Sequence, residues 1–441
     1  MFHQLQAREA AGKPIRAAVI GAGTFGTQII AQVSRMPGMR VAVVGELNAK
    51  RALTALGHGG KDPQLCREVD SASAINDAIR SDTPAITGNI DAIVQSQIDV
   101  VIEATGNVDA GALHAHRAIE ARKHVVMVTV EADVVVGPAL KKRADAAGVI
   151  YSMAYGDEPA VAYELWDHAR SLGFRVVACG KGTRFLPSFR KLNPDDVPAR
   201  YGFTGKDYNA QMFGSFLDGT KHNIEMTALS NATGLVPDVR GLHFPSADLR
   251  TLPDVLCSKE KGGILNQEGI VEAISSVHSD EKPVERNLRG GLYAVVDAPG
   301  DYYRKSLASY GDIIGVFMGK RSQYALLYRP HHLIGHEMPI TVARLMIYGH
   351  DCGAAVTKTS EVIAQAKRPI KAGEILDGEG GYAAYGLIER ATVAKQQKLV
   401  PMGLTHGAKA LQDIAEDQPI TFDNVAVADS FAHKLWREGK D

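Results

Sequence analysis

The chain has 441 residues and a formal net charge of −1, with 49 Lys and Arg against 50 Asp and Glu. This balance offers no basic face for nucleic acid or for an anionic membrane surface. The four cysteines form no C-x-x-C pair, which argues against a thiolate zinc site and a disulfide framework. A polar N-terminus without an apolar signal core, and the lack of an apolar run near the roughly 20 residues of a membrane span, predict a cytoplasmic protein.

The strongest local pattern is a glycine-rich turn between an apolar strand and an apolar helix, in which Gly21, Gly23 and Gly26 fit G-x-G-x-x-G. In this motif the first glycine allows a tight turn, the second lets the backbone approach a pyrophosphate, and the third lets the helix pack on the strand. The N–H groups that open the helix then face the phosphates. The alternative is an ordinary turn of an α/β sheet. We assign the dinucleotide site to Gly21, Gly23, Thr24, Phe25 and Gly26.

Apolar strands and helices alternate from residue 15 to about residue 150, which predicts a parallel sheet covered by helices. The second strand ends at Glu46, where such folds place the carboxylate that binds the adenosine ribose. Lys50 and Arg51 follow, and these cations would suit a 2′-phosphate. NAD and NADP therefore both stay open, and these side chains could also simply face solvent. We assign Glu46 and Arg51 to the adenosine end of the cofactor.

Two further strand ends are candidates, because ligands of such sheets bind at the carboxyl ends of the strands. The strand at residues 99–104 ends at Thr105 and Gly106, which we assign to the cofactor. The strand at residues 124–130 ends at Glu131. That carboxylate is either a catalytic group or a cap for the helix that follows.

Charged residues gather after the predicted cofactor domain. Asp157 and Glu158 follow another strand, and they either ligate Mg²⁺ or Mn²⁺ or merely favour a helix N-terminus. The strand at residues 175–184 leads into a basic turn that contains glycine, as expected for a phosphorylated substrate. The alternative is a solvated rim. The candidate phosphate ligands are Lys181, Arg184, Arg190 and Lys191.

A helix is predicted from about Ser215 to Ala232. Asp218, Lys221 and Glu225 are spaced by three and four residues, which places them on one face of that helix. The face is either a surface ladder of ion pairs or one wall of a cleft. As a cleft wall it would supply Lys221 and Asp218 as catalytic groups, and Glu225 as a third metal ligand beside Asp157 and Glu158.

Several runs carry a family resemblance. Residues 101–106 and 123–133 resemble homoserine dehydrogenase-related oxidoreductases. More specific runs resemble the deoxyxylulose-5-phosphate reductoisomerase-like family of type II. They are Tyr155-Gly156-Asp157-Glu158-Pro159-Ala160, residues 179–187, Leu217-Asp218-Gly219-Thr220-Lys221, residues 328–335 and Gly378-Glu379-Gly380-Gly381-Tyr382.

The resemblance covers nearly the whole chain and implies a Rossmann domain, a catalytic domain and a C-terminal SAF-like domain. It implies NADPH-dependent conversion of 1-deoxy-D-xylulose 5-phosphate to 2-C-methyl-D-erythritol 4-phosphate in isoprenoid biosynthesis, aided by a divalent cation. Because relatives are usually dimers, a homodimer is expected. The alternative is an NAD(P)-dependent dehydrogenase of another sugar-derived or homoserine-like substrate, without rearrangement or metal.

The predicted fold is α/β. It comprises a Rossmann domain at residues 1–154, an α+β catalytic domain at 155–350 and a small β-rich domain at 351–441. A helix from Arg329 to Ile347 is expected to pack back on the first domain. Residues 366–376 and 408–421 resemble each other in pattern, which predicts pseudo-twofold character in the last domain.

Overall fold

The computed structural model describes residues 1–204, 208–298, 300–311, 316–320 and 323–439. Its contacts divide the chain into two units. The first comprises residues 1–160, 333–356 and 430–441, and the second comprises residues 161–332 and 357–429. The boundaries predicted at residues 154 and 350 lie six residues from two of these dividing points. Among the described residues, no helix combines the length and the hydropathy that a bilayer crossing requires.

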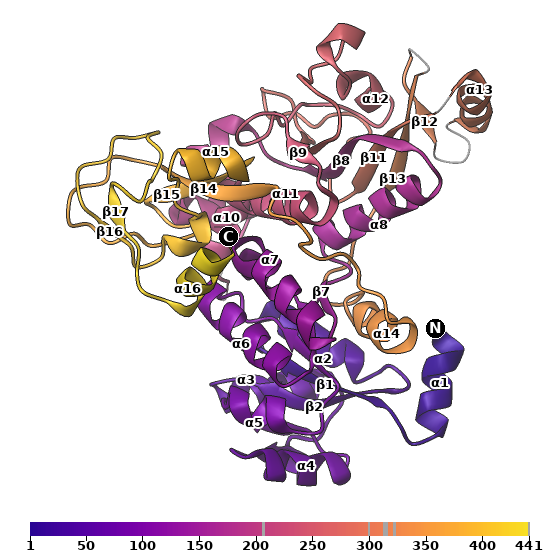
Figure 1. Ribbon diagram of the computed structural model, residues 1–441, viewed down its shortest axis with the longest axis vertical. Helices are drawn as coiled ribbons and strands as arrows, with labels where there is room; N and C mark the ends of the chain where they lie inside the picture. Colours follow the sequence, from indigo (N-terminus) through magenta and orange to yellow (C-terminus); the bar gives the residue numbers. More distant parts are fainter. Residues whose placement is uncertain (205–207, 299, 312–315, 321–322, 440–441) are drawn as a thin grey trace. The chain divides into compact units, whose positions relative to one another are not determined.

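The first unit contains a seven-stranded sheet in the order β3-β4-β2-β1-β5-β6-β7, and every paired strand in it is parallel. This is the predicted Rossmann-type sheet, so the α/β fold class is confirmed. The elements (Figure 1) are α1 (Phe2–Ala10), β1 (Ile15–Ile20), α2 (Thr24–Val33), β2 (Met39–Gly45), α3 (Ala49–His58), β3 (Arg67–Glu68), α4 (Ala72–Arg80), β4 (Ala85–Thr87), α5 (Ile90–Gln95), β5 (Val100–Glu103), α6 (Val108–Glu120), β6 (His124–Met127), α7 (Val130–Ala147), β7 (Tyr151–Met153), α14 (Pro339–Tyr348) and α16 (Phe431–Glu438).

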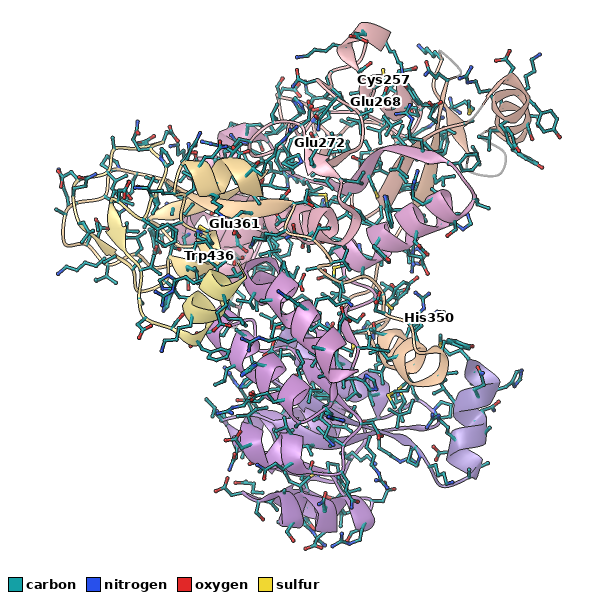
Figure 2. All side chains as sticks on the ribbon, in the orientation of Figure 1. Cys257, Glu268, Glu272, His350, Glu361 and Trp436 are labelled. Atoms are coloured by element: carbon teal, nitrogen blue, oxygen red, sulfur yellow. The ribbon has the colours of Figure 1, made fainter. Side chains whose placement is uncertain are left out.

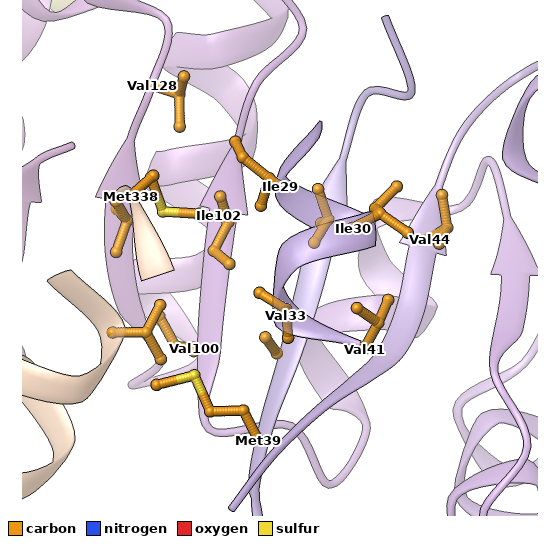
Figure 3. Close-up of a cluster of buried hydrophobic side chains, with 14 of the residues drawn as sticks. Ile29, Ile30, Val33, Met39, Val41, Val44, Val100, Ile102, Val128 and Met338 are labelled. Carbon is orange, nitrogen blue, oxygen red and sulfur yellow. The ribbon is translucent and has the colours of Figure 1, made fainter. Parts of the chain in front are cut away.

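The core of the first unit lies between this sheet and the helices α2 and α14. Ile29, Ile30 and Val33 of α2 are fully buried against β-branched residues of β1, β2 and β5 (Figure 3). The runs of Val and Ile in these strands suit a parallel sheet that is covered on both faces. Met338 and Val342 belong to the same cluster, so the predicted packing of a later helix on this domain is confirmed. That helix begins only at Pro339, because residues 330–338 are irregular.

The C-terminal helix α16 also belongs to the first unit and lies beside α6 and α7 (Figure 1). Asp109 at the start of α6 accepts a hydrogen bond from the N–H of Ala432, at 2.7 Å. Arg143 of α7 forms an ion pair with Glu438. The last residues of the chain therefore return to the domain in which the chain begins.

The second unit contains a mixed six-stranded sheet in the order β12-β13-β11-β8-β10-β9 and two antiparallel pairs, β14-β15 and β16-β17. Its helices and strands are α8 (Glu158–Ser171), β8 (Arg175–Thr183), α9 (Val197–Tyr201), α10 (Ala210–Leu217), α11 (Thr220–Thr233), β9 (Val236–Pro237), α12 (Leu252–Val255), β10 (Ile270–Ser275), β11 (Leu292–Asp297), α13 (Gly300–Tyr310), β12 (Phe317–Met318), β13 (Tyr324–Arg329), β14 (Ser360–Ala366), β15 (Ala384–Arg390), α15 (Ala391–Gln396), β16 (Lys409–Ala410) and β17 (Val425–Ala426).

The C-terminal β-rich part attaches to helix α11. The hydroxyl oxygen of Thr220 accepts a hydrogen bond from the N–H of Gly386, and the amide oxygen of Asn223 accepts one from the N–H of Ile388. These side chains satisfy backbone donors of β15 that would otherwise be left unpaired next to a buried helix. The two similar segments also pair with each other, since Ile370 and Ile414 exchange two backbone hydrogen bonds of 2.9 Å. Assignment of this part to a SAF-like domain stays a prediction.

Candidate functional site

The glycine turn of the first unit has the geometry that its sequence predicts. Gly21 adopts φ +98°, and a Cβ there would lie 2.6 Å from the carbonyl oxygen of Ala104. A Cβ on Gly26 would lie 1.9 Å from the carbonyl oxygen of Gly21. By contrast, a Cβ on Gly23 would meet no atom of the described residues within 4 Å. Gly21 and Gly26 are therefore required by packing, whereas Gly23 leaves open space before the N-terminus of α2, where a ligand phosphate could approach.

Glu46 lies directly after β2 and is tied to this turn. Its carboxylate accepts hydrogen bonds from the N–H of Ala22, at 2.9 Å, and from the N–H of Asn48, at 3.0 Å. The carboxylate therefore stands at the strand end where a ribose would bind. Arg51 is exposed in α3, so both features that the sequence indicates for the adenosine end are present.

Thr105 and Gly106 form the turn after β5, beside Gly21. The hydroxyl of Thr105 donates a hydrogen bond of 2.5 Å to the buried carboxylate of Glu103, and the N–H of Gly106 donates to the hydroxyl oxygen of Thr129. Strand β6 ends at Met127, earlier than expected, so Glu131 lies in the first turn of α7, half-buried. That position suits the helix dipole, as the capping alternative requires.

One expectation about the second unit is wrong, because residues 215–232 do not form a single helix. Helix α10 ends at Leu217 and α11 begins at Thr220. Gly219 separates them with φ +86°, and a Cβ there would lie 2.5 Å from the ring of Phe185. Asp218 therefore caps α10 and does not share a helix face with Lys221 and Glu225.

Asp218 is held in a buried ion pair with Lys367 from the end of β14, at 2.7 Å. The ammonium of Lys367 also donates hydrogen bonds to the carbonyl oxygens of Leu192 and Gly381. Burial raises the pKa of Asp218, and Lys367 opposes that rise. These hydrogen bonds connect three segments of the chain, so Asp218 has a structural role here. Lys221, which is half-buried at the start of α11, is therefore a better catalytic candidate than Asp218.

Glu225 forms a buried ion pair with Lys181 of β8. Both side chains of the Lys181–Glu225 ion pair are 1% exposed, so the alternative of a surface ladder of ion pairs does not apply. Lys181 lies in β8 and not in a turn, because that strand continues to Thr183. A Cβ on Gly180 or on Gly182 would lie within about 2 Å of a neighbouring carbonyl oxygen, so strand and turn packing explains these glycines.

Glu225 also meets the two carboxylates that follow β7. Asp157 precedes helix α8 and Glu158 is its first residue, and the division between the two units falls inside this continuous helix. One ligand oxygen each of Asp157, Glu158 and Glu225 lie within 4.8 Å of one another, and all three residues are buried. Within the described residues, Oε1 of Glu225 has no hydrogen-bond partner. An all-oxygen donor set of this kind fits Mg²⁺ or Mn²⁺.

His222 is a neighbour of this cluster that the sequence analysis left without a role. Its Nε2 lies 3.0 Å from the hydroxyl of Thr183, and its Nδ1 lies 3.9 Å from Glu225. The rings of Phe185, Phe216 and Phe244 surround the imidazole, with centroid distances of 5.7, 5.9 and 6.2 Å. The i, i+3 spacing to Glu225 is the one sequence signal that could have pointed to it.

The four predicted phosphate ligands do not share one partner. Lys181 pairs with Glu225, and Lys191 pairs with Asp417 and Glu416 at 2.5 and 2.9 Å. Arg190 donates to the carbonyl oxygen of Gly241, and burial lowers its pKa. Arg184 is the most exposed of the four and contacts Glu281 only at 3.7 Å.

Arg289 is a further cation near Arg184 that the sequence did not single out. The turn that carries it pairs with β8 through Gly182, whose missing side chain makes room for Leu288. Burial raises the pKa of Tyr201, while Arg289, Arg184 and Lys181 act on this phenol in the opposite direction. Arg289 is exposed, and it forms no ion pair with any residue of the described ranges.

Comparison with protein families identifies residues 156–338, less than half of the chain, as similar to the catalytic domain of the oxidoreductase DRL. The matched segment contains the three clustered carboxylates, Lys181 and Arg289. Comparison with curated proteins gives no match.

Among solved structures, 1-deoxy-D-xylulose 5-phosphate reductoisomerase from Zymomonas mobilis in complex with NADPH is 14% identical, with a TM-score of 0.36. The alignment covers 49% of this chain and 57% of that one, so the chain spans less than two thirds of its length. A DOX-P reductoisomerase in complex with magnesium is 16% identical, with 48% and 56% covered and a TM-score of 0.32. The Bacillus subtilis protein yvaA, provisionally described as an oxidoreductase, is 13% identical, with 76% and 89% covered and a TM-score of 0.37.

At such identities and scores these structures carry no argument about activity. The glycine turn on a parallel sheet and the family match nevertheless agree on a chemical class. The chain has the fold of an NAD(P)-dependent oxidoreductase, and its middle segment is similar to the DRL catalytic domain.

Proposed function

We propose that this protein is an NADPH-dependent reductoisomerase that converts 1-deoxy-D-xylulose 5-phosphate to 2-C-methyl-D-erythritol 4-phosphate, a step of isoprenoid biosynthesis. The observation that carries the proposal is the cluster of Asp157, Glu158 and Glu225 within the segment similar to the DRL catalytic domain. A simple hydride transfer to a carbonyl does not need three buried carboxylates around one point. A skeletal rearrangement of a sugar phosphate uses such a cluster to hold a cation against vicinal substrate oxygens.

We assign a separate role to each group of residues. Asp157, Glu158 and Glu225 would hold the divalent cation, which when bound supplies a Lewis acid that polarises substrate oxygens. Lys181 neutralises part of the carboxylate charge and fixes the orientation of Glu225. Lys221 stands one turn before Glu225 on α11, and we assign it to orient a reacting oxygen. Glu131 remains a proposed catalytic carboxylate of the first unit.

The substrate phosphate is assigned to Arg184 and Arg289. Both are exposed; Arg184 makes only the long ion pair with Glu281, at 3.7 Å, and Arg289 makes none within the described residues. The guanidinium group binds phosphate in a bidentate manner, which favours these two over the paired Lys181 and Lys191. Arg190 is half-buried and donates to the carbonyl oxygen of Gly241, so it is a weaker candidate for the phosphate. NADPH is proposed over NADH because Arg51, which is exposed in α3, follows Glu46 by five residues and could bind a 2′-phosphate. A cytoplasmic homodimer is the proposed form in the cell.

Replacing Gly23 by alanine should weaken NADPH binding by at least about tenfold while leaving the melting temperature unchanged. The added methyl group meets open space in the protein but occupies the place where the pyrophosphate would approach the backbone. Nicotinamide fluorescence measures the affinity. Gly57→Ala is a matched control, because Gly57 also faces open space, on the exposed side of α3, and should keep full affinity. Equal affinity in Gly23→Ala would remove the cofactor assignment.

The proposed activity is tested by NADPH oxidation with 1-deoxy-D-xylulose 5-phosphate, followed at 340 nm. We expect oxidation that EDTA abolishes and that Mg²⁺ or Mn²⁺ restores, with 2-C-methyl-D-erythritol 4-phosphate as the product identified by mass spectrometry and NMR. Oxidation that EDTA does not affect would point to a plain dehydrogenase. Lack of oxidation, in a sample that binds NADPH, would exclude this substrate.

A further inference from the structure

The segment 240–244 of the second unit has an unusual backbone. Leu242 and Phe244 adopt φ values of +63° and +50°, in the left-handed region that bulky L-residues rarely enter. Both side chains are buried, at 4% and 3% exposure. Such a conformation persists only where the surroundings determine it strongly, and it gathers at functional sites.

The carboxylate of Glu272 stabilises this unusual backbone by accepting hydrogen bonds from it. Glu272 lies in the middle of β10 and is fully buried (labelled in Figure 2). Its two oxygens accept hydrogen bonds from the N–H of His243, at 3.2 and 3.0 Å, and one of them accepts from the N–H of Phe244, at 3.3 Å. Two consecutive donors in the unusual segment therefore converge on one side chain, with bonds that a carboxylate makes stronger than a neutral acceptor would.

The neighbours of Glu272 are consistent with a holding role. The imidazole of His243 is engaged elsewhere, because its Nε2 lies 2.7 Å from the carboxylate of Asp238. The hydroxyl of Tyr293 donates to the main-chain oxygen of Glu272 and not to its carboxylate. Burial raises the pKa of Glu272 to about 7, and the N–H donors of His243 and Ala273 act against that rise. Burial of such a carboxyl group lowers the stability of the fold, so its presence must be explained by something other than stability.

The backbone that Glu272 holds determines where the ring of Phe244 lies. Its ring packs on Phe185 with a centroid distance of 4.4 Å and closes the aromatic enclosure of His222. His222 in turn contacts Thr183 and lies next to Glu225. A chain of direct contacts therefore runs from Glu272 through the backbone of residues 243–244 and the ring of Phe244 to the carboxylate site.

We propose that Glu272 is a positioning residue, which holds Leu242 and Phe244 in left-handed backbone conformations so that Phe244 fixes the imidazole of His222 beside the carboxylate site. Its relevance to catalysis rests on the proposed function, but the contact chain itself does not. The first test therefore uses no substrate.

The test is ¹³C NMR of protein labelled at histidine Cε1, with the His222 signal assigned by its loss in His222→Gln. Glutamine at position 272 keeps the size of the side chain but replaces one accepting oxygen with an NH₂ group. In Glu272→Gln we expect Phe244 to leave the imidazole, so that the His222 signal moves toward its position in Phe244→Ala.

The decisive variant is Leu242→Gly in the Glu272→Gln background. Glycine adopts the left-handed region without strain, so the backbone at position 242 no longer depends on the hydrogen bonds to the Glu272 carboxylate. The double variant should recover at least half of the displacement of the His222 signal. Lys398→Gly is the matched control, because Lys398 also has a positive φ, of +52°, but lies outside this segment and is exposed. It should recover none.

An unmoved His222 signal in folded Glu272→Gln, or equal recovery with Lys398→Gly, would overturn the proposal. If Glu272→Gln does not fold, Glu272→Asp replaces it, since aspartate keeps both acceptors but withdraws them by one methylene, and the same recovery by Leu242→Gly is expected. In the activity assay, kcat should fall and recover in parallel with the signal while NADPH affinity stays constant. A recovered signal without any activity in the unmodified protein would reject the proposed function and not the contact chain.

Discussion

Glu225→Gln is expected to lower turnover by about 100- to 1,000-fold and to destabilise the second unit as well. The first effect follows from the loss of one carboxylate from a three-carboxylate cluster, and single charged groups at such centres contribute two or three orders of magnitude. The second effect follows because the variant breaks the buried Lys181–Glu225 ion pair, and breaking a buried pair by removing one charge typically costs about 3–5 kcal/mol. Steady-state kinetics and urea-induced unfolding measure the two effects separately.

A second variant separates the two roles of Glu225. In Lys181→Met/Glu225→Gln neither charge remains, so most of the lost stability should return. Turnover should not return, because the cluster still lacks its third carboxylate. If activity recovers together with stability, Glu225 acts only through folding and the assignment of a cation site fails. NADPH affinity should be unchanged in both variants, since the glycine turn lies in the other unit.

Lys367→Met is expected to lower the free energy of unfolding by about 3–5 kcal/mol. The ammonium of Lys367 satisfies three acceptors at once, the carboxylate of Asp218 and the carbonyl oxygens of Leu192 and Gly381, and it is almost fully buried. Methionine fills the space of the side chain but leaves all three acceptors without their donor. Urea-induced unfolding, followed by far-UV circular dichroism, measures the loss.

The deficit of Lys367→Met should also depend on pH. Burial already raises the pKa of Asp218, and loss of the opposing cation raises it further. A carboxyl group whose pKa is higher in the folded state than in the unfolded state loses stability as the pH rises from its ordinary value toward the folded one. The deficit should therefore be smaller at pH 5 than at pH 8. Lys371→Met is the control, because its ion pair with Asp413 is exposed on both sides and is screened by solvent, so its loss should leave the stability nearly unchanged. A comparable loss in the control would contradict the assignment.

Local features of the chain were predicted well where one short stretch decides them. Gly21 and Gly26 of the turn are needed for contacts within the turn itself and with the end of one neighbouring strand, so spacing alone indicates the turn. The parallel sheet follows from apolar runs of Val and Ile separated by helical segments. The helix that begins at Pro339 carries its apolar residues at helical spacing, and its packing on the first unit was expected for that reason.

Partner choice among charged residues was predicted less well. Lys221 and Glu225 suit each other by helix spacing, yet Glu225 pairs with Lys181, which is 44 residues away in the chain. Asp218 was placed on the same helix face because nothing in its own stretch shows that Phe185 needs Gly219 beside it, and this close approach breaks the helix. Lys191 was assigned to phosphate, while its acidic partners lie at residues 416 and 417. The roles of the candidate site residues themselves stay predictions.

The amino-acid pattern alone was sufficient for the α/β class, the nucleotide-binding turn and the residue types of the candidate site, because these depend on interactions of near neighbours and on hydrophobic period. Only the folded chain decides that Asp157, Glu158 and Glu225 meet, that Arg289 comes beside Arg184, and that Glu272 holds the backbone at Phe244. Those arrangements depend on distances between segments that are 28 to 105 residues apart. The packing of distant segments decides which charged residue pairs with a buried charge, and this partner cannot be read from the sequence.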